Sequence, residues 1–190
     1  MKKLVFLIFA TVLSGSLIAQ TTNWTIDKAH SRLAFTVVHL GLSDIEGDFK
    51  DFDVKIKSAK ADFSDAIFEM TSKINSINTG IEKRDKHLKS PDFFDATKNP
   101  TMTFISSSIK KVGKNKFKLT GNLTIAGVTK KVTMDLIHRG TIDEKDHTKR
   151  AAFQLTGTIN RKDFNVGTGT SKMVVSETVK IKADGAFKNK

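Results

Sequence analysis

The sequence contains no cysteine, only two prolines, and no segment after its first twenty residues that is apolar enough to span a membrane. The absence of cysteine excludes a disulfide framework, a thiolate metal site, a cysteine nucleophile and a lipid anchor attached to cysteine. A chain of 190 residues can bury a core without cross-links. Its 38% hydrophobic residues and mixed charge are not those of a disordered protein. Because no internal repeat or linker divides the chain, we expect one domain.

The first nineteen residues have the pattern of a secretory signal peptide. Met1-Lys2-Lys3 is a short basic start, residues 4–13 are apolar except for Thr11, and Ala19 suits the last position before cleavage. The apolar run falls short of the about 20 residues of a membrane span, although an uncleaved N-terminal anchor is the alternative. Cleavage would leave 190 − 19 = 171 residues (20–190) with a formal charge of 12 − 2 = +10. This signal, in a chain without cysteine, favours export to a bacterial periplasm.

After the signal peptide, apolar residues recur at every second position in one segment after another. Period two is typical of strands with one buried face. Turn residues separate the segments, and both prolines lie outside them, as strands require. About eight such strands predict an all-β fold, either an antiparallel barrel or a sandwich. The side chains expected on the buried face include Leu33, Phe35, Val37, His39, Phe52, Val54, Phe68, Met70, Met102, Phe104, Leu123, Met134, His138, Phe153, Leu155 and Ile181.

One segment breaks the strand period. Thr79-Gly80-Ile81-Glu82 fits a capping box, in which a threonine hydroxyl and a glutamate three residues later satisfy each other's free backbone N–H groups. Ile81, Arg84 and Leu88 follow at helical spacing, and Ser90-Pro91 ends the pattern. We therefore expect a short helix, over about 79–90, that lies over one mouth of the barrel.

The excess of basic residues, 32 Lys and Arg against 20 Asp and Glu, raises the question of a nucleic-acid partner. The lysines lie mostly in turns and on the solvent-facing parity of the strands, where lysines protect sheet edges. The phenylalanines share the buried parity, where they cannot stack on bases. These positions argue against nucleic acid. A transient contact with an anionic membrane surface fits clustered lysines better.

Common catalytic signatures are absent from the sequence. It holds no G-x-S-x-G elbow, no phosphate-binding loop, no dinucleotide fingerprint and no H-E-x-x-H motif. The simplest interpretation of each histidine is a hydrogen-bonded residue at the end of a strand or helix. The alternative is a joint metal site of His30, His39 and His87 with Asp85, although their spacing does not prove that they converge. We expect no catalytic residue, no metal site and no cofactor.

Two interpretations stay open for the buried face, which is rich in Phe, Val, Leu, Ile and Met. These residues form an ordinary core, or they line a hollow barrel that holds one small ligand. A long apolar chain would bind such a wall by burial alone, at about 25 cal/mol per Å² of apolar surface. A few polar groups at the mouth would then hold its head group. The pattern by itself favours the ordinary core.

A set of motifs covers almost all of residues 23–187. They are Trp24-x-Ile26-Asp27-x-x-His30-Ser31, Gly47-x-Phe49, Ile77-x-Thr79-Gly80, Arg84-Asp85-x-His87-Leu88, Phe93-Phe94-Asp95, Pro100-x-x-x-Phe104, Gly121-x-Leu123-Thr124-Ile125-x-Gly127 and Asn160-Arg161-x-Asp163-Phe164. In combination they resemble the YceI family of exported, lipocalin-like, polyisoprenoid-binding proteins. One departure is Asn165, because the family usually has glycine after Asp-Phe.

The resemblance implies an elongated, antiparallel, lipocalin-like β-barrel of about eight strands in a bacterial periplasm. Its pore would hold a polyisoprenoid, an isoprenoid quinone or a fatty-acyl chain, and the protein would serve the transport, storage or metabolism of such lipids. Of these roles we expect a binding or carrier protein rather than an enzyme. A homodimer is also implied. The residues expected to bind the lipid are Phe35, Val37, His39, Phe52, Val54, Phe68, Met70, Arg84, His87, Phe104, Met134 and Phe153.

Two questions stay open at this point, one on Arg84 and one on the function. Arg84 contacts the head group together with His39 and His87, or it is a structural anchor paired with Asp27 or Asp92. The protein is a carrier, or it is an enzyme that acts on a lipid through a His–Asp or His–metal pair. The third possible function is that of an interaction module whose barrel has a solid core.

Overall fold

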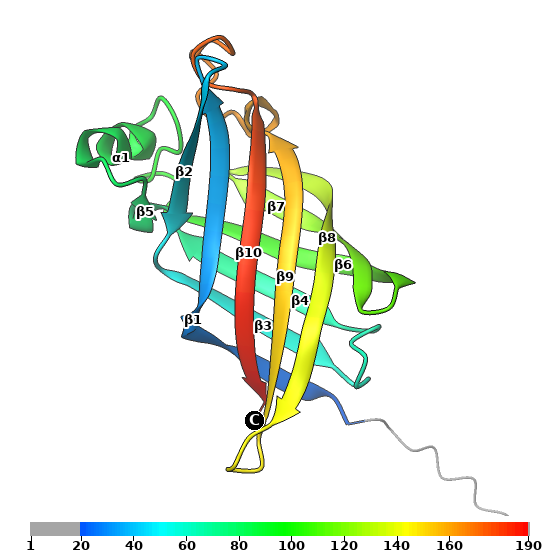
Figure 1. The fold of residues 1–190 in the computed structure, drawn as a ribbon. Helices are drawn as coiled ribbons and strands as arrows, with labels where there is room; N and C mark the ends of the chain where they lie inside the picture. The colour runs from blue at the N-terminus through cyan, green and yellow to red at the C-terminus, as the bar shows by residue number, and fades with distance from the viewer. Residues whose placement is uncertain (1–19, 190) are drawn as a thin grey trace, which may run out of the picture.

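The computed structural model describes residues 20–189, and the expected signal peptide lies outside them (Figure 1). No helix in this range is long and apolar enough to cross a membrane. In chain order the elements are β1 (Thr22–His39), β2 (Ser43–Phe49), β3 (Phe52–Ser58), β4 (Ile67–Lys73), a 3-10 turn (Ile74–Ser76), β5 (Ile77–Asn78), α1 (Glu82–Lys89), β6 (Thr101–Gly113), β7 (Lys116–Ile125), β8 (Val128–Asp143), β9 (Lys149–Asn160), a 3-10 turn (Arg161–Phe164) and β10 (Thr178–Asn189).

The strands close into an antiparallel barrel. Their order is β10-β9-β8-β7-β6-β4-β3-β1, and β1 also pairs with β10, so that eight strands form a ring. The short strands β2 and β5 add to this ring beside the second half of β1. The predicted barrel of about eight strands is confirmed, and the sandwich alternative is excluded because the sheet has no break between two layers.

Strand β1 bends at a bulge between Asp27 and Arg32, where its register with β10 shifts. The Asp27 carboxylate accepts a hydrogen bond from the N–H of Ala29 at 3.1 Å, and its carbonyl accepts one from the Ser31 hydroxyl at 2.7 Å. Before the bulge β1 pairs with β3, and after it β1 pairs with β2. A single strand therefore builds the wall at both ends of the barrel.

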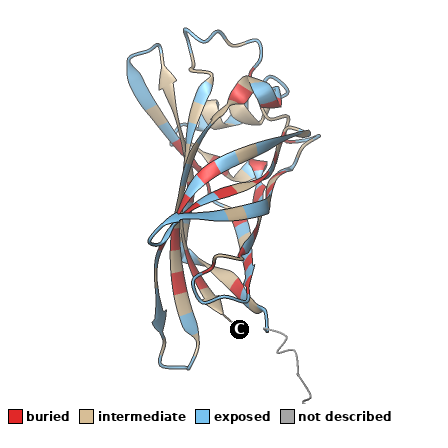
Figure 2. Ribbon diagram, turned by 90° about the vertical axis from the view of Figure 1, so that its right-hand side faces the viewer, coloured by how far each residue is buried: buried red, intermediate tan, exposed pale blue. Residues whose placement is uncertain are grey.

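The predicted alternation of side chains is present in the strands. In β7 the buried positions are every second residue from Phe117 to Ile125, and the residues between them are exposed or half-buried. Figure 2 shows the same alternation of buried and exposed residues along the barrel strands. Pro91 and Pro100 lie outside all strands. Period two thus placed the inner face correctly.

The helix is shorter than expected, and the predicted capping box is wrong. Helix α1 begins at Glu82, and no side chain caps its first turn. Gly80 has φ of +79°, so the chain turns away from helical geometry between Thr79 and the helix. The Asp85 carboxylate, not that of Glu82, reaches back and accepts hydrogen bonds from the N–H of Thr79 at 2.9 Å and from its hydroxyl at 2.5 Å.

Candidate functional site

The barrel encloses an apolar cavity of about 450 Å³. This volume lies within the range of small-molecule sites, about 300–1,000 Å³. The side chains of the barrel therefore do not fill its interior. The solid-core alternative requires that they do. All twelve residues that the sequence analysis expected to bind a ligand line this one cavity; their contact with a ligand stays a prediction. They are Phe35, Val37, His39, Phe52, Val54, Phe68, Met70, Arg84, His87, Phe104, Met134 and Phe153.

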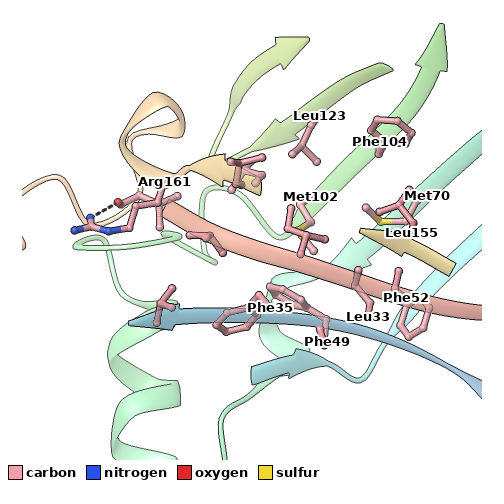
Figure 3. Close-up of a pocket in the computed structure, with 18 of the residues that line it drawn as sticks. Leu33, Phe35, Phe49, Phe52, Met70, Met102, Phe104, Leu123, Leu155 and Arg161 are labelled. Atoms are coloured by element: carbon pink, nitrogen blue, oxygen red, sulfur yellow. Dashed lines mark hydrogen bonds between the residues drawn. The ribbon is translucent and has the colours of Figure 1, made fainter. Parts of the chain in front are cut away.

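The wall of the cavity is aromatic and aliphatic around most of its circumference (Figure 3). The ring of Phe49 lies between those of Phe35 and Phe94, with centroids 5.8 and 6.1 Å away. From the opposite wall, Met70, Met102, Phe104, Leu123 and Leu155 contribute flexible or branched apolar groups. Such a surface offers dispersion contacts along its length but almost no hydrogen bonds.

An aromatic cluster packs around Phe153, toward one end of the cavity. Phe153 lines the cavity and stacks on His138, with ring centroids 5.0 Å apart. Phe63 packs edge-on against both rings, and Trp24 packs against Phe63 at 5.2 Å. Phe63 is only 1% exposed, and burial lowers the pKa of His138. We call Trp24, Phe63, His138 and Phe153 the aromatic plug.

Phe63 of this plug lies in the loop between β3 and β4. Phe63 has a left-handed backbone, with φ of +58°, which is uncommon for a bulky residue. Asp65 holds the loop: its carboxylate accepts hydrogen bonds from the Ser58 hydroxyl and from the N–H groups of Ala59 and Lys60 at 2.5–3.2 Å. The loop therefore holds a residue with an unfavourable backbone conformation against the rings of His138 and Phe153.

Polar side chains gather at the opposite end of the cavity, beside α1. Arg84 lines the cavity there and donates hydrogen bonds from Nε to the Thr79 hydroxyl and from Nη2 to the Thr79 carbonyl, both at 2.7 Å. The alternative pairing of Arg84 with Asp27 or Asp92 is wrong, because Asp27 bonds Arg150 and Asp92 lies near His87. Arg84 is thus anchored and also faces the cavity.

The histidines do not meet in one place. His39 and His87 line the cavity, and Nε2 of His87 lies 3.5 Å from the Asp92 carboxylate. His30 instead lies on the β1 bulge, 69% exposed, with Nδ1 2.9 Å from Asp27. The joint metal site of three histidines is therefore wrong, and residues 20–189 hold no other group of three or more candidate ligands.

Arg161 is a polar cavity residue that sequence reasoning missed. It follows β9 directly and is only 4% exposed. Its five N–H groups donate to the backbone carbonyls of Val166, Gly167, Thr170, Val175 and Ser176. Burial lowers the pKa of its guanidinium, against the opposing influence of Glu177. Arg161 therefore holds the loop between β9 and β10, which forms part of the mouth.

The comparison with known proteins decides the family. The pattern of the YceI-like domain matches residues 24–187. The chain belongs to the YceI family. It is 39% identical over 169 residues to Protein YceI of Salmonella agona, which covers 88% of each chain.

Two solved structures share the barrel. Burkholderia cenocepacia BcnA superimposes with a TM-score of 0.77 at 30% identity, over 85% of this chain and 98% of BcnA. A polyisoprenoid binding domain from Saccharophagus degradans superimposes with a TM-score of 0.67 over 86% of this chain and 97% of that domain. Its identity is 18%, so this likeness shows the fold alone.

The one departure from the family motifs has a local explanation. Asn165 ends the 3-10 turn after β9 with φ of +58°. Glycine adopts this left-handed conformation freely, and asparagine is among the few other residues that tolerate it. The substitution of asparagine for the usual YceI glycine therefore keeps the turn that leads into the Arg161 loop.

Proposed function

We propose that this protein is a periplasmic carrier that holds one long apolar lipid in the barrel. The lipid is a polyisoprenoid, an isoprenoid quinone or a fatty-acyl chain. The observation that carries the proposal is the cavity of about 450 Å³, whose walls are mainly apolar along the barrel and carry Arg84, His39 and His87 near one end. Burial of a hydrocarbon chain there gains about 25 cal/mol per Å².

The arrangement of the two ends supports an oriented ligand. The aromatic plug closes the far end with rings, which suits the tail of a chain. His39, His87 and Arg84 lie at the mouth, where they meet the head group. The family and the polyisoprenoid binding domain with the same fold are consistent with this assignment. Export through cleavage of residues 1–19 is part of the proposal.

An enzyme acting on a lipid is the second candidate, and the His87–Asp92 pair at the mouth is the observation that favours it. Both side chains are more than half exposed, and a general base works best where it is positioned and partly desolvated. We therefore assign His87 to head-group contact. For a carrier, His87→Ala should weaken lipid binding. For an enzyme, the same variant should keep lipid binding and lose turnover.

The test is native mass spectrometry of the protein purified from its host, followed by uptake of added prenol. We expect a co-purifying lipid of one class. Leu155→Trp should block uptake, because Leu155 lines the cavity. Thr156→Trp is the matched control, since Thr156 is the next residue of β9 and is exposed. Absence of lipid in the native protein, with no uptake of prenol, would overturn the proposal.

A further inference from the structure

Two loops that are far apart in the sequence form a single apolar tip beside the mouth of the cavity. The first is the turn between β1 and β2, with Leu40 53% and Leu42 87% exposed. The second belongs to the segment between β9 and β10, with Met173 73% and Val174 42% exposed. We call these four residues the apolar tip. They are four of the nine large hydrophobic residues exposed within residues 20–189.

Backbone hydrogen bonds lock the two loops together. The N–H of Leu40 donates to the carbonyl of Val174 at 3.0 Å, and the N–H of Ser176 donates to the carbonyl of Val38 at 2.9 Å. His39 and Val175 form a β-bridge between them. Arg161 also stabilises the second loop, because its guanidinium donates hydrogen bonds to backbone carbonyls of that loop. The tip is therefore a built feature of the fold, at the top of the molecule in Figure 1.

The apolar tip is continuous with the interior. Val174 belongs to the tip and also lines the cavity. Val175 and His39, which lie beside the tip, line the cavity as well. A hydrocarbon chain that leaves the cavity at this mouth meets apolar side chains before it meets water. Exposed apolar patches of this kind mark sites of interaction on proteins.

We propose that the apolar tip inserts into the surface of an anionic lipid bilayer and places the cavity mouth against the acyl chains. This inference rests on the proposed function, because a lipid carrier must exchange its cargo with a membrane. The tip is small: four partly exposed side chains offer less surface than the about 800 Å² per partner of a standard protein interface. A bilayer needs no such area, since a few apolar groups can enter its interface.

The charges favour the same partner. The chain without residues 1–19 has a net charge of +10, from the total of +12 less Lys2 and Lys3. Lys172 adjoins the tip in sequence, and the exposed Lys83 and Lys86 lie on α1 beside the same mouth. Basic residues near an anionic membrane surface each contribute about 1 kcal/mol. They would orient the barrel, while the apolar residues would hold it there.

The experiment is co-sedimentation with vesicles of phosphatidylcholine that contain about one-quarter phosphatidylglycerol. The protein should bind, and Leu42→Asp with Met173→Asp should bind at least about tenfold more weakly. The matched control is Ile142→Asp with Val112→Asp. Those residues are 62% and 52% exposed, lie away from the tip, and receive the same added charge. The control should bind as the unchanged protein does.

A second pair of variants separates insertion from charge. Leu42→Ser with Met173→Ser removes the apolar groups without adding carboxylates, and it should also lose binding. Equal binding by this variant and the unchanged protein would overturn the proposal, as would the absence of vesicle binding by the unchanged protein. A dimer in sedimentation equilibrium that only the tip variants disrupt, with no vesicle binding, would assign the tip to a second copy instead.

Failure of this inference is distinguishable from failure of the carrier function. Prenol added from ethanol, without vesicles, should bind equally to the unchanged protein and to all tip variants, because the cavity wall is intact in each. Loss of vesicle binding with retained prenol uptake would support the membrane role of the tip. Prenol uptake by none of the proteins would overturn the carrier function, on which this inference rests.

Discussion

Phe35 lies over Gly47, its partner on the neighbouring strand β2. A Cβ atom at Gly47 would lie 2.4 Å from Cζ of Phe35 and 2.9 Å from Cγ2 of Thr79, closer than side-chain atoms can approach. The missing side chain makes room for the aromatic ring in the cavity wall. It also makes room for Thr79, which anchors Arg84 at the mouth.

Gly47→Ala should therefore disturb the cavity and the mouth together. We expect a loss of about 1–3 kcal/mol in the free energy of unfolding, from overpacking, and weaker prenol binding. Urea denaturation and a binding titration measure the two effects. Gly169→Ala is the control, because no heavy atom lies within 4 Å of a Cβ there and its φ is not positive. Equal behaviour of the two variants would contradict the close approach.

We expect the aromatic plug to limit the depth of the cavity. Phe63→Ala should lower the free energy of unfolding by about 3–5 kcal/mol, because it empties the centre of the plug, and alanine gains nothing from the left-handed backbone, which only glycine adopts freely. It should also open the closed end and shift the preferred ligand toward longer chains. Competition between prenols of different length, read by native mass spectrometry, measures this shift.

The control for the plug is Ile74→Ala. Ile74 is fully buried but does not line the cavity, so its loss should lower stability without changing the preferred chain length. A Phe63→Ala protein with unchanged chain-length preference would show that the plug does not limit the ligand.

Arg161 should be intolerant of a charge-conserving substitution. A lysine cannot replace a planar guanidinium that donates to five carbonyls. We expect Arg161→Lys to cost about 3 kcal/mol and to raise hydrogen exchange across residues 165–176. The exposed Arg139 provides the control Arg139→Lys, which should change neither quantity. Unchanged exchange in the Arg161 variant would contradict its role in holding the mouth.

A set of ion pairs whose stabilising effect depends on pH lies at the end of the barrel beside the β8–β9 turn. Nη1 of Arg150 lies 2.5 Å from the Asp27 carboxylate, and Nε lies 2.6 Å from that of Glu144. The Arg150 hydrogen bond, followed by that of His30, lowers the pKa of Asp27 to about 2 from the ordinary value of 3.8. The unfolded chain therefore takes up a proton before the folded protein does as the pH falls.

The stabilisation from Asp27 is fully present above about pH 4 and declines as the pH falls toward 2. Asp27→Asn should be less stable than the unchanged protein at pH 7, and the difference should shrink between pH 4 and 2. Urea midpoints across this range measure it. A difference that stays constant with pH would contradict the ion pair as its source.

Strand periodicity predicted the barrel and its inner face because the strand repeat of two is a direct geometric consequence of the pleat. Phe35, Met134 and Phe153 could be placed without any tertiary information. The period carries no information on whether facing side chains meet or leave a gap, so the pattern alone favoured a solid core. The resemblance to a family, not the periodicity, pointed to the cavity.

The features that the sequence did not predict depend on long-range or unusual local geometry. Phe63 lies in a loop with a left-handed backbone that is disfavoured for phenylalanine, so neither period nor propensity marks it. The guanidinium of Arg161 donates hydrogen bonds only to backbone carbonyls. Because every residue has one, no residue type in the sequence marks these partners. The capping box failed because Gly80 turns the chain before the helix, which leaves Asp85 to bond Thr79.

The most direct test of this account is a crystal structure of the protein purified from its own host. We expect continuous, elongated density inside the barrel, with its tail against Phe153 and its polar end near Arg84 and His87. A barrel in which the side chains of Phe35, Phe104 and Met134 have moved inward to fill the interior, with no such density, would contradict it.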